Sequence, residues 1–464
     1  MIKTSANLTR FAIVLSAALL SACSNTGKIE ASNIDSNIEG ITDAELSATY
    51  WLESTDDVNN TILTPQQITK LNQAQLSQDT YLFDPLSYPE SLPKQQVLRL
   101  IQAISKPSKY DRFYPNGQQL SAADYQPYLD EMAVNQIKAQ QTVQFAVAAK
   151  RSALRMLPTL DRVLNSGMDF DIDRFQESAV FPGEALAVLH TSKTGKWAFV
   201  QNYHYRAWVQ TKDIALASKA DVTALTKDPN FLLVTGAKVL TNFNPYDNST
   251  SEVQLDMGVK LPLISPAEFK AYELDRQNPY ASHIVALPTR DEDGKLIIKP
   301  TLIGKNADVN KGYIAFTKAN VIKQGFKFLG ERYGWGHDFN GRDCTGFVGE
   351  IYKTFGILMP RNSSQQGKAL YGSNTRFEKN AKITDKLSAF GKMEVGDLIY
   401  LPGHVAMYLG ESQGQPFIIH DVHGLSYENS NSQQVKGVLN GVSVTPLLPF
   451  KGYLKGIYNI KKVR

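Results

Sequence analysis

The spacing of hydrophobic and polar residues changes along the chain, and each change indicates a different kind of secondary structure. In the first third, apolar residues recur three or four positions apart, most clearly in segments 97–101 and 130–147. This spacing is typical of amphipathic helices. Farther on, short apolar runs such as 185–189 and 197–200 are separated by turn residues. Runs of that kind predict closely spaced strands and a small β-barrel.

The strand-rich pattern continues to about residue 310, and a mixed pattern follows. Runs 283–289 and 296–303 flank Asp291 to Gly294, which is a typical hairpin turn. The rest of the chain alternates the two patterns, so we expect both helices and strands there. The predicted helices lie near 321–329 and 344–355, and the predicted strands near 397–401, 404–409 and 417–421.

These patterns predict a multidomain α+β fold. Gly183, the Lys196-Trp197 strand and the later strand Ala207 to Val209 resemble bacterial SH3-like domains. The next strand-rich region is interpreted as a second, more diverged barrel. The predicted domains are a helical N-terminal domain at 46–142, two small SH3-like β-barrels at 143–217 and 218–310, and an α+β domain at 311–464.

Residues 1–23 have the order of an export signal. Basic residues at positions 3 and 10 precede an apolar core at 11–20. This core is too short to span a membrane. The segment that ends at Cys23 resembles a bacterial lipobox, which implies lipidation of Cys23; a plain secretory signal is the alternative. By the same resemblance, Ser24 suggests the periplasmic face of the outer membrane. Residues 24–45 are polar and predict a flexible linker.

Composition narrows the classes of function. The 464 residues carry a formal net charge of only +4, which argues against a nucleic-acid partner. The two cysteines are Cys23 and Cys344, so there is no disulfide framework. A single remaining thiol in an exported protein is therefore a candidate for chemistry.

Cys344 follows Asp343, a good helix N-cap residue, and begins an amphipathic segment that Gly356 ends. In the first turn of a helix, unsatisfied N–H groups and the dipole favour the thiolate. A thiolate is a usable nucleophile near neutral pH, and the Cys344 N–H could stabilise an oxyanion. The alternative is that Cys344 is only a small buried hydrophobe.

A nucleophilic cysteine needs a base, and strand register selects one among the seven histidines. If the last hairpin turns near Gln413, opposed residues have numbers that sum to roughly 824–826. His404 then faces His420 or its near neighbour, and both point to one face of the sheet. Ala406 on that face leaves room for a packed helix. We therefore predict His404 as general base and acid and His420 as orienter of its ring.

A metal site is the main alternative for these histidines. His420, Asp421 and His423 are close in sequence, and His404 could join them. Adjacent strand residues point to opposite faces, however, which makes a poor tetrahedral cage. We expect no metal and no cofactor.

The C-terminal motifs form an ordered pattern over about 320–425 that resembles the NlpC-type cell-wall cysteine peptidases, a papain-like superfamily. The helical domain and two SH3-like domains upstream resemble the same family. These motifs are Tyr333-Gly334-Trp335-Gly336, Asp343-Cys344-Thr345-Gly346-Phe347, Gly356 to Ser363 with Gln366, Gly396-Asp397-Leu398, Gly403 to Gly410 and Ile419-His420.

The resemblance implies hydrolysis of peptidoglycan stem peptides between γ-D-glutamate and the diamino acid. It implies that the residue before the nucleophile grips the free ammonium of an N-terminal L-alanine. Thr345 stands where the family more often has Ser, and His337 where Gly is common; we expect His337 to be solvated. The implied substrate-binding residues are Asp343, Tyr333 near the oxyanion, Thr345 and Ser363 at the D-glutamate carboxylate, and a groove-capping tyrosine, Tyr205 or its alternative Tyr203.

The resulting prediction is a monomeric, lipid-anchored periplasmic peptidase that acts on peptidoglycan stems. Two alternatives remain. One is a wall-binding lipoprotein with weak or no catalysis, although the complete set of Cys344, His404 and His420 argues against it. The other is an amidase or acyltransferase that uses the same three residues.

Overall fold

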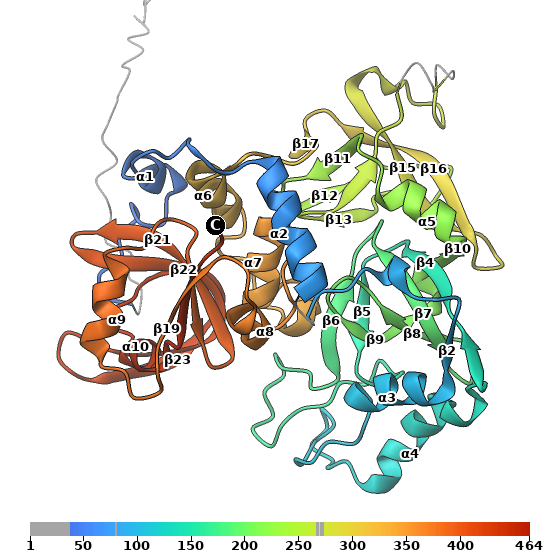
Figure 1. Cartoon of the computed structure of the whole chain (residues 1–464), viewed down its shortest axis with the longest axis horizontal. Helices are drawn as coiled ribbons and strands as arrows, with labels where there is room; N and C mark the ends of the chain where they lie inside the picture. The colour runs from blue at the N-terminus through green and yellow to red at the C-terminus, as the bar shows by residue number, and fades with distance from the viewer. Residues whose placement is uncertain (1–37, 79–80, 266–268, 270–272) are drawn as a thin grey trace, which may run out of the picture.

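The computed structural model describes residues 38–78, 81–265, 269 and 273–464 (Figure 1). The predicted export signal, lipidation at Cys23 and most of the predicted linker lie outside the described residues. In the part of the chain that is described, no helix is both long and apolar enough to cross a lipid bilayer.

The helix predicted at 97–101 is present, whereas the one predicted at 130–147 is wrong: α4 ends at Glu131, and strands β3 and β4 follow. The N-terminal helices belong to two different cores. Trp51 of α1 and Ile68 of α2 are buried in the core of the C-terminal domain. Val97 and Ile101 of α3 instead pack in one core with Trp208 of the first barrel. The region 46–142 therefore connects the C-terminal domain with the first barrel and does not enclose one core of its own. Its helices and strands are α1 (Ala48–Glu53), β1 (Thr61–Leu63), α2 (Pro65–Gln78), β2 (Ser91–Pro93), α3 (Lys94–Ile104), α4 (Ala122–Glu131) and β3 (Gln140–Thr142).

The first strand-rich domain is a seven-stranded sheet in the order β10-β4-β7-β8-β9-β5-β6. The apolar runs predicted as strands at 185–189 and 197–200 lie in β7 and β8, which pair antiparallel. This sheet is the part of the barrel that reaches the C-terminal domain, through β6. Its strands are β4 (Gln144–Ala148), β5 (Ser152–Arg155), β6 (Gln176–Val180), β7 (Ala185–Thr191), β8 (Trp197–Gln201), β9 (Arg206–Gln210) and β10 (Ile214–Ala217).

The second strand-rich domain encloses a separate small core that includes Leu232, Leu261 and Val285. The predicted hairpin is confirmed: β15 and β16 pair from Ser282↔Gly304 to Arg290↔Leu296. Gly294 adopts φ +82° in its turn, a conformation that suits glycine. The elements of this domain are α5 (Lys219–Thr226), β11 (Phe231–Val234), β12 (Lys238–Leu240), β13 (Gln254–Asp256), β14 (Lys260–Pro262), β15 (Ser282–Arg290), β16 (Leu296–Gly304) and β17 (Val309–Lys311).

The C-terminal domain is built on a six-stranded sheet in the order β19-β24-β20-β21-β22-β23. Helices α6 and α7 cover one face through Ile322, Phe347 and Ile351. Helices α9 and α10 cover the other, where Phe390 and Leu454 are buried. Its elements are β18 (Phe316–Thr317), α6 (Lys318–Phe326), η5 (Trp335–Asn340), α7 (Cys344–Lys353), α8 (Ser363–Lys368), β19 (Ser373–Arg376), α9 (Ile383–Phe390), β20 (Leu398–Leu401), β21 (His404–Ser412), β22 (Gln415–Glu428), β23 (Gln434–Pro446), α10 (Lys451–Gly456) and β24 (Asn459–Lys462).

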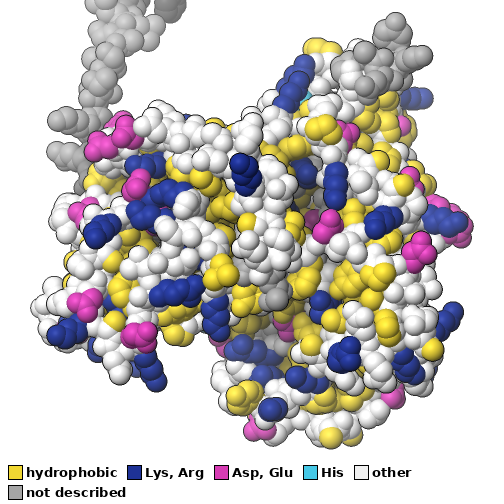
Figure 2. Space-filling model, in the orientation of Figure 1, with side chains coloured by type: hydrophobic (Ala, Val, Ile, Leu, Met, Phe, Trp, Pro, Cys, Tyr) yellow, Lys and Arg dark blue, Asp and Glu magenta, His cyan; other side chains and the backbone are white. Residues whose placement is uncertain are grey.

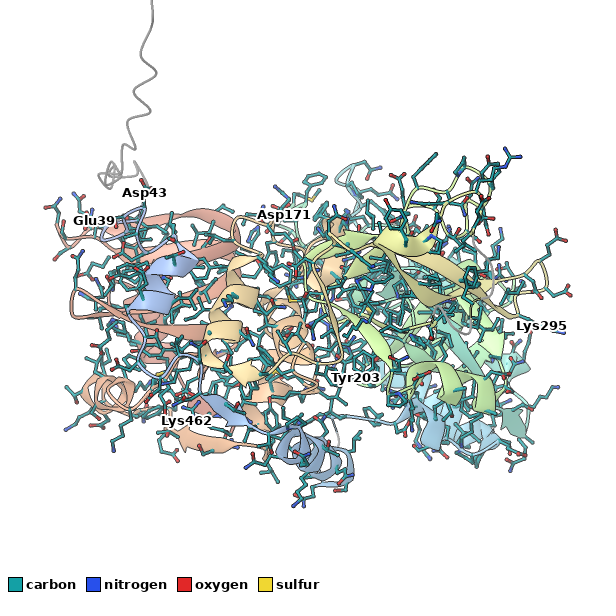
Figure 3. The ribbon with its side chains drawn as sticks, turned by 90° about the horizontal axis from the view of Figure 1, so that it is seen from above. Glu39, Asp43, Asp171, Tyr203, Lys295 and Lys462 are labelled. Atoms are coloured by element: carbon teal, nitrogen blue, oxygen red, sulfur yellow. The ribbon has the colours of Figure 1, made fainter. Side chains whose placement is uncertain are left out.

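The C-terminal domain and the two strand-rich domains lie side by side, and α2 crosses between them (Figure 1). Basic side chains are scattered over the face shown in Figure 2, with acidic side chains among them. In the view from above, Asp171 and Tyr203 both lie where the C-terminal domain meets the strand-rich half (Figure 3).

Candidate active site

Cys344 is the first residue of α7, as the sequence predicts. Asp343 is the N-cap, and its side chain accepts a hydrogen bond from the Gly346 N–H. The side chain of Cys344 is buried in the same core as Val405 of β21. The first N–H groups of a helix have no partner within it, so the Cys344 N–H is a candidate oxyanion donor.

The expected thiolate is not the resting form of Cys344. Burial, together with the negative charge of Asp343, raises the pKa of the Cys344 thiol to about 12. The Val405 backbone N–H acts in the opposite direction. At this site the loss of solvent outweighs the helix N-terminus, so the sulfur is protonated before substrate binds.

His404 and His420 form the pair that strand register predicts. His404 Nε2 lies 2.9 Å from His420 Nδ1. Near this point β21 and β22 pair as Met407↔Ile419, so the two histidines are diagonal neighbours on one face rather than directly opposed. His420 Nε2 is in turn 3.1 Å from Thr445 Oγ1.

Both imidazoles are neutral. Burial lowers the pKa of His404 to about 4 and that of His420 well below its ordinary value. A neutral imidazole has one donor and one acceptor nitrogen. One consistent arrangement has His404 Nε2–H donate to His420 Nδ1, and His420 Nε2–H donate to Thr445. His404 Nδ1 then keeps its lone pair, and no hydrogen bond to it forms within the described residues.

The helix over Ala406 is not the cysteine helix. Ala406 packs with Leu454 and Ile457, next to α10. Helix α7 packs on the opposite face, against Val405 and Met407. Among the described residues no hydrogen bond joins the Cys344 sulfur to either imidazole. The contact of Cys344 with β21 is at the Val405 backbone N–H, one residue after His404.

Asp343 sits in an ionic cluster on the other side of Cys344. Arg361 donates to Asp343 Oδ2 from Nη2 at 2.6 Å and to Oδ1 from Nη1 at 3.1 Å. Thr345 Oγ1 and the Gly346 and Gly336 N–H groups donate to the same carboxylate at 2.8, 2.9 and 3.0 Å. Burial alone would raise the pKa of Asp343, but the Arg361 guanidinium holds it well below its usual value.

In this cluster the Asp343 carboxylate and the hydroxyl proton of Thr345, two of the predicted substrate-binding groups, are already hydrogen-bonded. A carboxylate offers about four acceptor sites, and Asp343 already accepts five hydrogen bonds. The Thr345 hydroxyl donates to Asp343 and accepts from Arg361 Nη1 at 2.6 Å. Their predicted contacts with substrate stay predictions, and each would require an internal bond to break.

The other predicted substrate-binding residues are differently placed. Tyr333 is buried, and burial together with the negative charge of Asp343 raises its pKa. Ser363 is the first residue of α8, and its hydroxyl makes no hydrogen bond within the described residues. Tyr205 donates to Glu177 of β6, whereas Tyr203 lies beside the Lys353 ammonium. Arg361 acts on both tyrosines, and Asp343 acts on Tyr205.

Sequence reasoning missed Arg361, Thr445 and Glu177. Each acts through a partner far away in sequence, so the local pattern gives no signal for Glu177 or Thr445. Arg361 lies within the motif Gly356 to Ser363, and a basic residue at that place is the one signal that could have drawn attention to it. His337 was expected to be solvated, and this is wrong: only 4% of it is exposed, and its ring is hydrogen-bonded.

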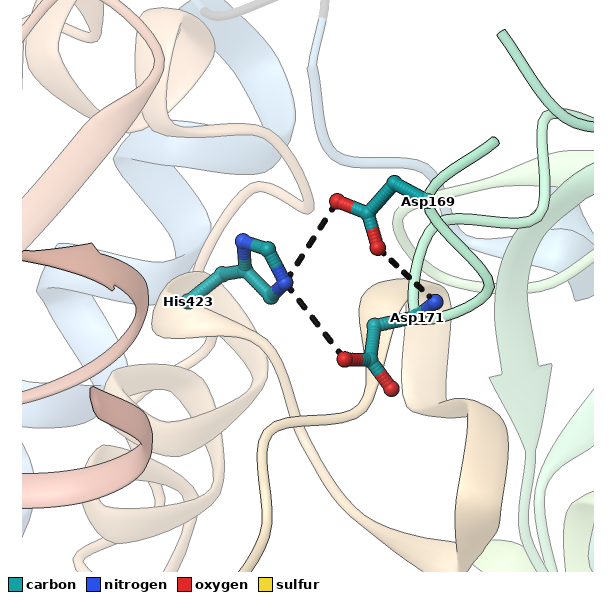
Figure 4. A group of neighbouring side chains, drawn as sticks. All are labelled: Asp169, Asp171 and His423. Carbon is teal, nitrogen blue, oxygen red and sulfur yellow. Dashed lines mark hydrogen bonds and ion pairs between the residues drawn. The ribbon is translucent and has the colours of Figure 1, made fainter. Parts of the chain in front are cut away.

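One group of side chains in the described residues could hold a metal ion: Asp169, Asp171 and His423 (Figure 4). His423 Nε2 lies 3.4 and 3.5 Å from the two carboxylates. Asp171 is already bound by Arg332 and by Asn440 at 2.9 Å. These contacts link His423 of β22 to the 163–172 loop of the first barrel. The alternative metal set of His404, His420, Asp421 and His423 is not brought together.

Asp421 is a buried carboxyl with no hydrogen-bond partner for either oxygen within the described residues. It points away from its neighbour His420, as strand parity predicts. Burial raises its pKa well above the usual value, and the nearby Asp343 and Glu331 add to this. Asp421 is therefore a neutral acid, and if ionised it would act against a thiolate at Cys344.

Comparison with known proteins confirms the predicted resemblance. Residues 330–444 match the NlpC/P60 family, and residues 158–210 match an SH3 domain of the SH3b1 type. Both histidines and the cysteine lie within the first of these ranges. The chain thus carries an NlpC/P60 domain behind an SH3b domain.

Curated relatives are named as peptidases. A gamma-D-glutamyl-L-lysine dipeptidyl-peptidase of Bacillus cereus is 27% identical over 216 residues, which cover 45% of this chain and 54% of the relative. The bifunctional muramidase/DL-endopeptidase CwlT of Bacillus subtilis is 29% identical over 130 residues, which cover 28% of this chain and 36% of the relative. The match thus spans about half of the first relative and about a third of the second.

The whole arrangement has a structural counterpart. An NlpC/P60 endopeptidase from Photobacterium damselae subsp. piscicida superimposes with a TM-score of 0.70 over 90% of this chain and 96% of its own. Sequence identity is 18%, so the likeness concerns the fold. It confirms the predicted fold class: helices at the N-terminus, an SH3b domain and a C-terminal α+β domain.

Proposed function

We propose that this chain, whose residues 330–444 form an NlpC/P60 domain, hydrolyses an amide bond in the peptide stems of peptidoglycan, with Cys344 as nucleophile. The observation that carries the proposal is the histidine pair beside the cysteine helix. His404 and His420 are hydrogen-bonded at 2.9 Å, and α7 places Cys344 against the residue that follows His404. The names of the relatives support peptidoglycan as the substrate.

The chemistry follows from the protonation states of the site. The thiol proton passes to His404 Nδ1 as the sulfur attacks the amide carbonyl, so the S–C bond forms and the oxyanion lies at the helix N-terminus. The C–N bond then breaks, and His404 returns its proton to the departing amine. Water, activated by the same imidazole, hydrolyses the thioester and releases a carboxylate. His420 holds the His404 ring throughout.

The finer proposal is cleavage of the bond between γ-D-glutamate and the diamino acid, with preference for stems that begin with a free L-alanine. Glu177 supports this preference better than Asp343. Glu177 bonds to Tyr205 through one oxygen, and its other oxygen accepts no hydrogen bond within the described residues. Burial raises the pKa of Glu177, so a substrate ammonium would stabilise its charge.

The proposed setting is the periplasmic face of the outer membrane, with a lipid on Cys23 as anchor and the protein acting as a monomer. The lipobox-like segment before Cys23 supports the anchor. Metabolic labelling with a fatty acid tests it: label should enter the wild-type protein and be absent from Cys23→Ser. Label retained by Cys23→Ser would contradict the anchor.

A defined stem peptide tests the function. Purified protein should release the N-terminal L-Ala-γ-D-Glu fragment, and Cys344→Ala should release none above background while it melts at the same temperature. Mass spectrometry of the products identifies the bond that is cut. A matched peptide with acetylated L-alanine tests the ammonium preference. Activity retained by Cys344→Ala would contradict the mechanism, and equal rates on both peptides would contradict the preference.

A further inference from the structure

His337 is a buried histidine for which the proposed chemistry has no use. It lies in η5, seven residues before Cys344, with φ 66° in the left-handed region. Its ring packs edge-on against Phe181 of the first barrel, with centroids 5.3 Å apart. Only 4% of the residue is exposed. A polar ring in such a place must be hydrogen-bonded to be tolerated.

Both ring nitrogens have partners, and the partners fix the tautomer. Nε2 lies 3.1 Å from Glu350 Oε1, and Nδ1 lies 3.4 Å from Arg361 Nη2. An ionised carboxylate only accepts and a guanidinium only donates. His337 therefore donates from Nε2 and accepts at Nδ1, which is the neutral form. Burial lowers the pKa of His337 well below its ordinary value, and the positive charge of Arg361 acts in the same direction.

The acceptor nitrogen of His337 completes the set of partners of Arg361. A guanidinium has five N–H donors. Nε donates to Ser178 at 2.8 Å, and the Nη1 and Nη2 atoms donate to both oxygens of Asp343 and to Thr345 Oγ1. His337 Nδ1 takes the remaining N–H. Every donor of Arg361 is thus paired, and the plane of the guanidinium is fixed from three sides.

The cysteine helix is shaped to admit this ring. A Cβ atom at Gly346 would lie 2.7 Å from His337 Nε2 and 3.0 Å from Cε1. Glu350, one turn farther along α7, receives the Nε2–H and also binds Arg342 Nε at 2.5 Å. His337 therefore contacts α7 on the side that carries Asp343 and Glu350.

We propose that His337 is a positioning residue for the nucleophile. Through Nδ1 it orients the Arg361 fork on Asp343, and Asp343 caps the helix whose first residue is Cys344. Its action on the sulfur is indirect, through the charge balance of Asp343 and the placement of the first turn of α7. The consequence for cleavage depends on the proposed function, whereas the consequence for the thiol does not.

The two amide replacements of His337 separate its two hydrogen bonds. In His337→Asn the amide can take the place of Nδ1, so it can accept from Arg361 but cannot reach Glu350. In His337→Gln the amide can take the place of Nε2, so it can donate to Glu350 but leaves the Arg361 N–H unpaired. Asn also tolerates positive φ. His337→Ala removes both bonds.

We expect kcat on the stem peptide to fall by roughly ten- to a hundredfold in His337→Ala and His337→Gln, with KM within about threefold, because a misplaced nucleophile lowers the rate of the chemical step. His337→Asn should recover most of that loss. His190→Ala is the matched control: His190 is also buried, and its Nε2 is 2.9 Å from the Met132 carbonyl. It should lower the melting temperature and leave kcat unchanged.

A second measurement does not depend on the substrate. Alkylation of Cys344 by iodoacetamide, followed by peptide mapping to separate it from Cys23, reports the thiol directly. In His337→Gln the Asp343 charge is less well balanced, so we expect alkylation at pH 8 to slow about threefold or more, which corresponds to half a pKa unit. Equal alkylation rates in all variants would overturn the proposal. Losses of kcat that simply follow the drop in melting temperature in His337→Asn, His337→Gln and His190→Ala would overturn it as well. A wild-type protein that cleaves no stem peptide but shows the alkylation difference would refute the proposed function and retain this inference.

Discussion

The two polar clusters on either side of Cys344 are built on opposite principles. The His404–His420–Thr445 cluster is neutral, and one of its nitrogens keeps a lone pair. The Asp343–Arg361 cluster is ionic, and all five Arg361 N–H donors and both Asp343 oxygens are used. A group that moves protons must have an unused atom, whereas a group that fixes geometry is most rigid when it has none. The comparison assigns chemistry to the first cluster and position to the second.

The neutral cluster gives the largest expected effect. His404→Ala removes the only imidazole that we place to accept the thiol proton, and the pKa of Cys344 is raised to about 12. General-base catalysis contributes roughly 10²- to 10⁴-fold, so kcat on the stem peptide should fall by about that factor while the melting temperature changes little. Steady-state kinetics with a defined peptide measure it. A loss of less than tenfold would mean that another group takes the proton.

The ionic cluster should respond in stability. Arg361→Met leaves the Asp343 carboxylate buried without its cation, and breaking a buried pair in this way costs about 3–5 kcal/mol. Denaturant unfolding measures the loss. The control is the double variant Arg361→Met with Asp343→Asn, which removes the unpaired charge and should recover part of the stability. Strictly additive losses would show that the two side chains do not act as a pair.

Most of the active-site elements could be predicted from the sequence, because they are local. The helix that begins at Cys344, the turn at Gln413 and the shared face of His404 and His420 all follow from periodicity and strand parity. The resting state of the thiol could not be predicted, since the helix N-terminus is visible in the sequence but the burial that outweighs it is not. The buried position of His337 depends on Phe181, which lies in another domain.

The boundary of the helical region shows the same limit. Apolar spacing predicts α3 and a mostly helical region around it, but it does not say which core each helix faces. Ile68 packs with the C-terminal domain, and Val97 packs with the first barrel. An amphipathic pattern identifies the buried face of a helix but not the partner of that face. The region predicted as one helical domain therefore packs partly in the core of the C-terminal domain and partly in the core of the first barrel.

Asp421 extends the comparison to a carboxyl that belongs to neither cluster. The pKa of Asp421 in the folded protein is raised above its unfolded value of about 4. Below that value the carboxyl is protonated in both states, so it does not change the free energy of unfolding. As the pH rises above that value, only the unfolded state loses the proton, and the folded protein becomes less stable. Asp421→Asn should therefore match the wild type near pH 4 and be more stable at pH 7, by about 1–3 kcal/mol. Unfolding at both pH values measures the difference.

Asp173 provides the opposite control for Asp421. It is buried like Asp421, but its carboxylate is paired with Arg155 at 2.6 Å. Asp173→Asn should destabilise the protein at pH 7. If both variants change stability in the same direction, the absence of a partner at Asp421 is not what sets its effect.

The smallest expected effect is on the dependence of kcat/KM on pH, at its acid end. His404 must be neutral to accept a proton, and its pKa is lowered to about 4. The acid limb of kcat/KM reports the free enzyme, so activity should fall about tenfold per pH unit only below about pH 4. Circular dichroism at each pH separates this from unfolding, since buried neutral histidines also lower stability in acid. A limb near pH 6.5 would indicate a solvated base.

The most direct test is to trap the intermediate on the sulfur. Protein mixed with a defined stem peptide and quenched in acid within the first turnover should carry the L-Ala-γ-D-Glu acyl group as a thioester, and peptide mapping should place it on Cys344. We expect this adduct in the wild type, a longer-lived adduct in variants with slowed hydrolysis, and none in Cys344→Ala. Product formation with no acyl group on Cys344 at any quench time, or with the acyl group on another residue, would contradict it.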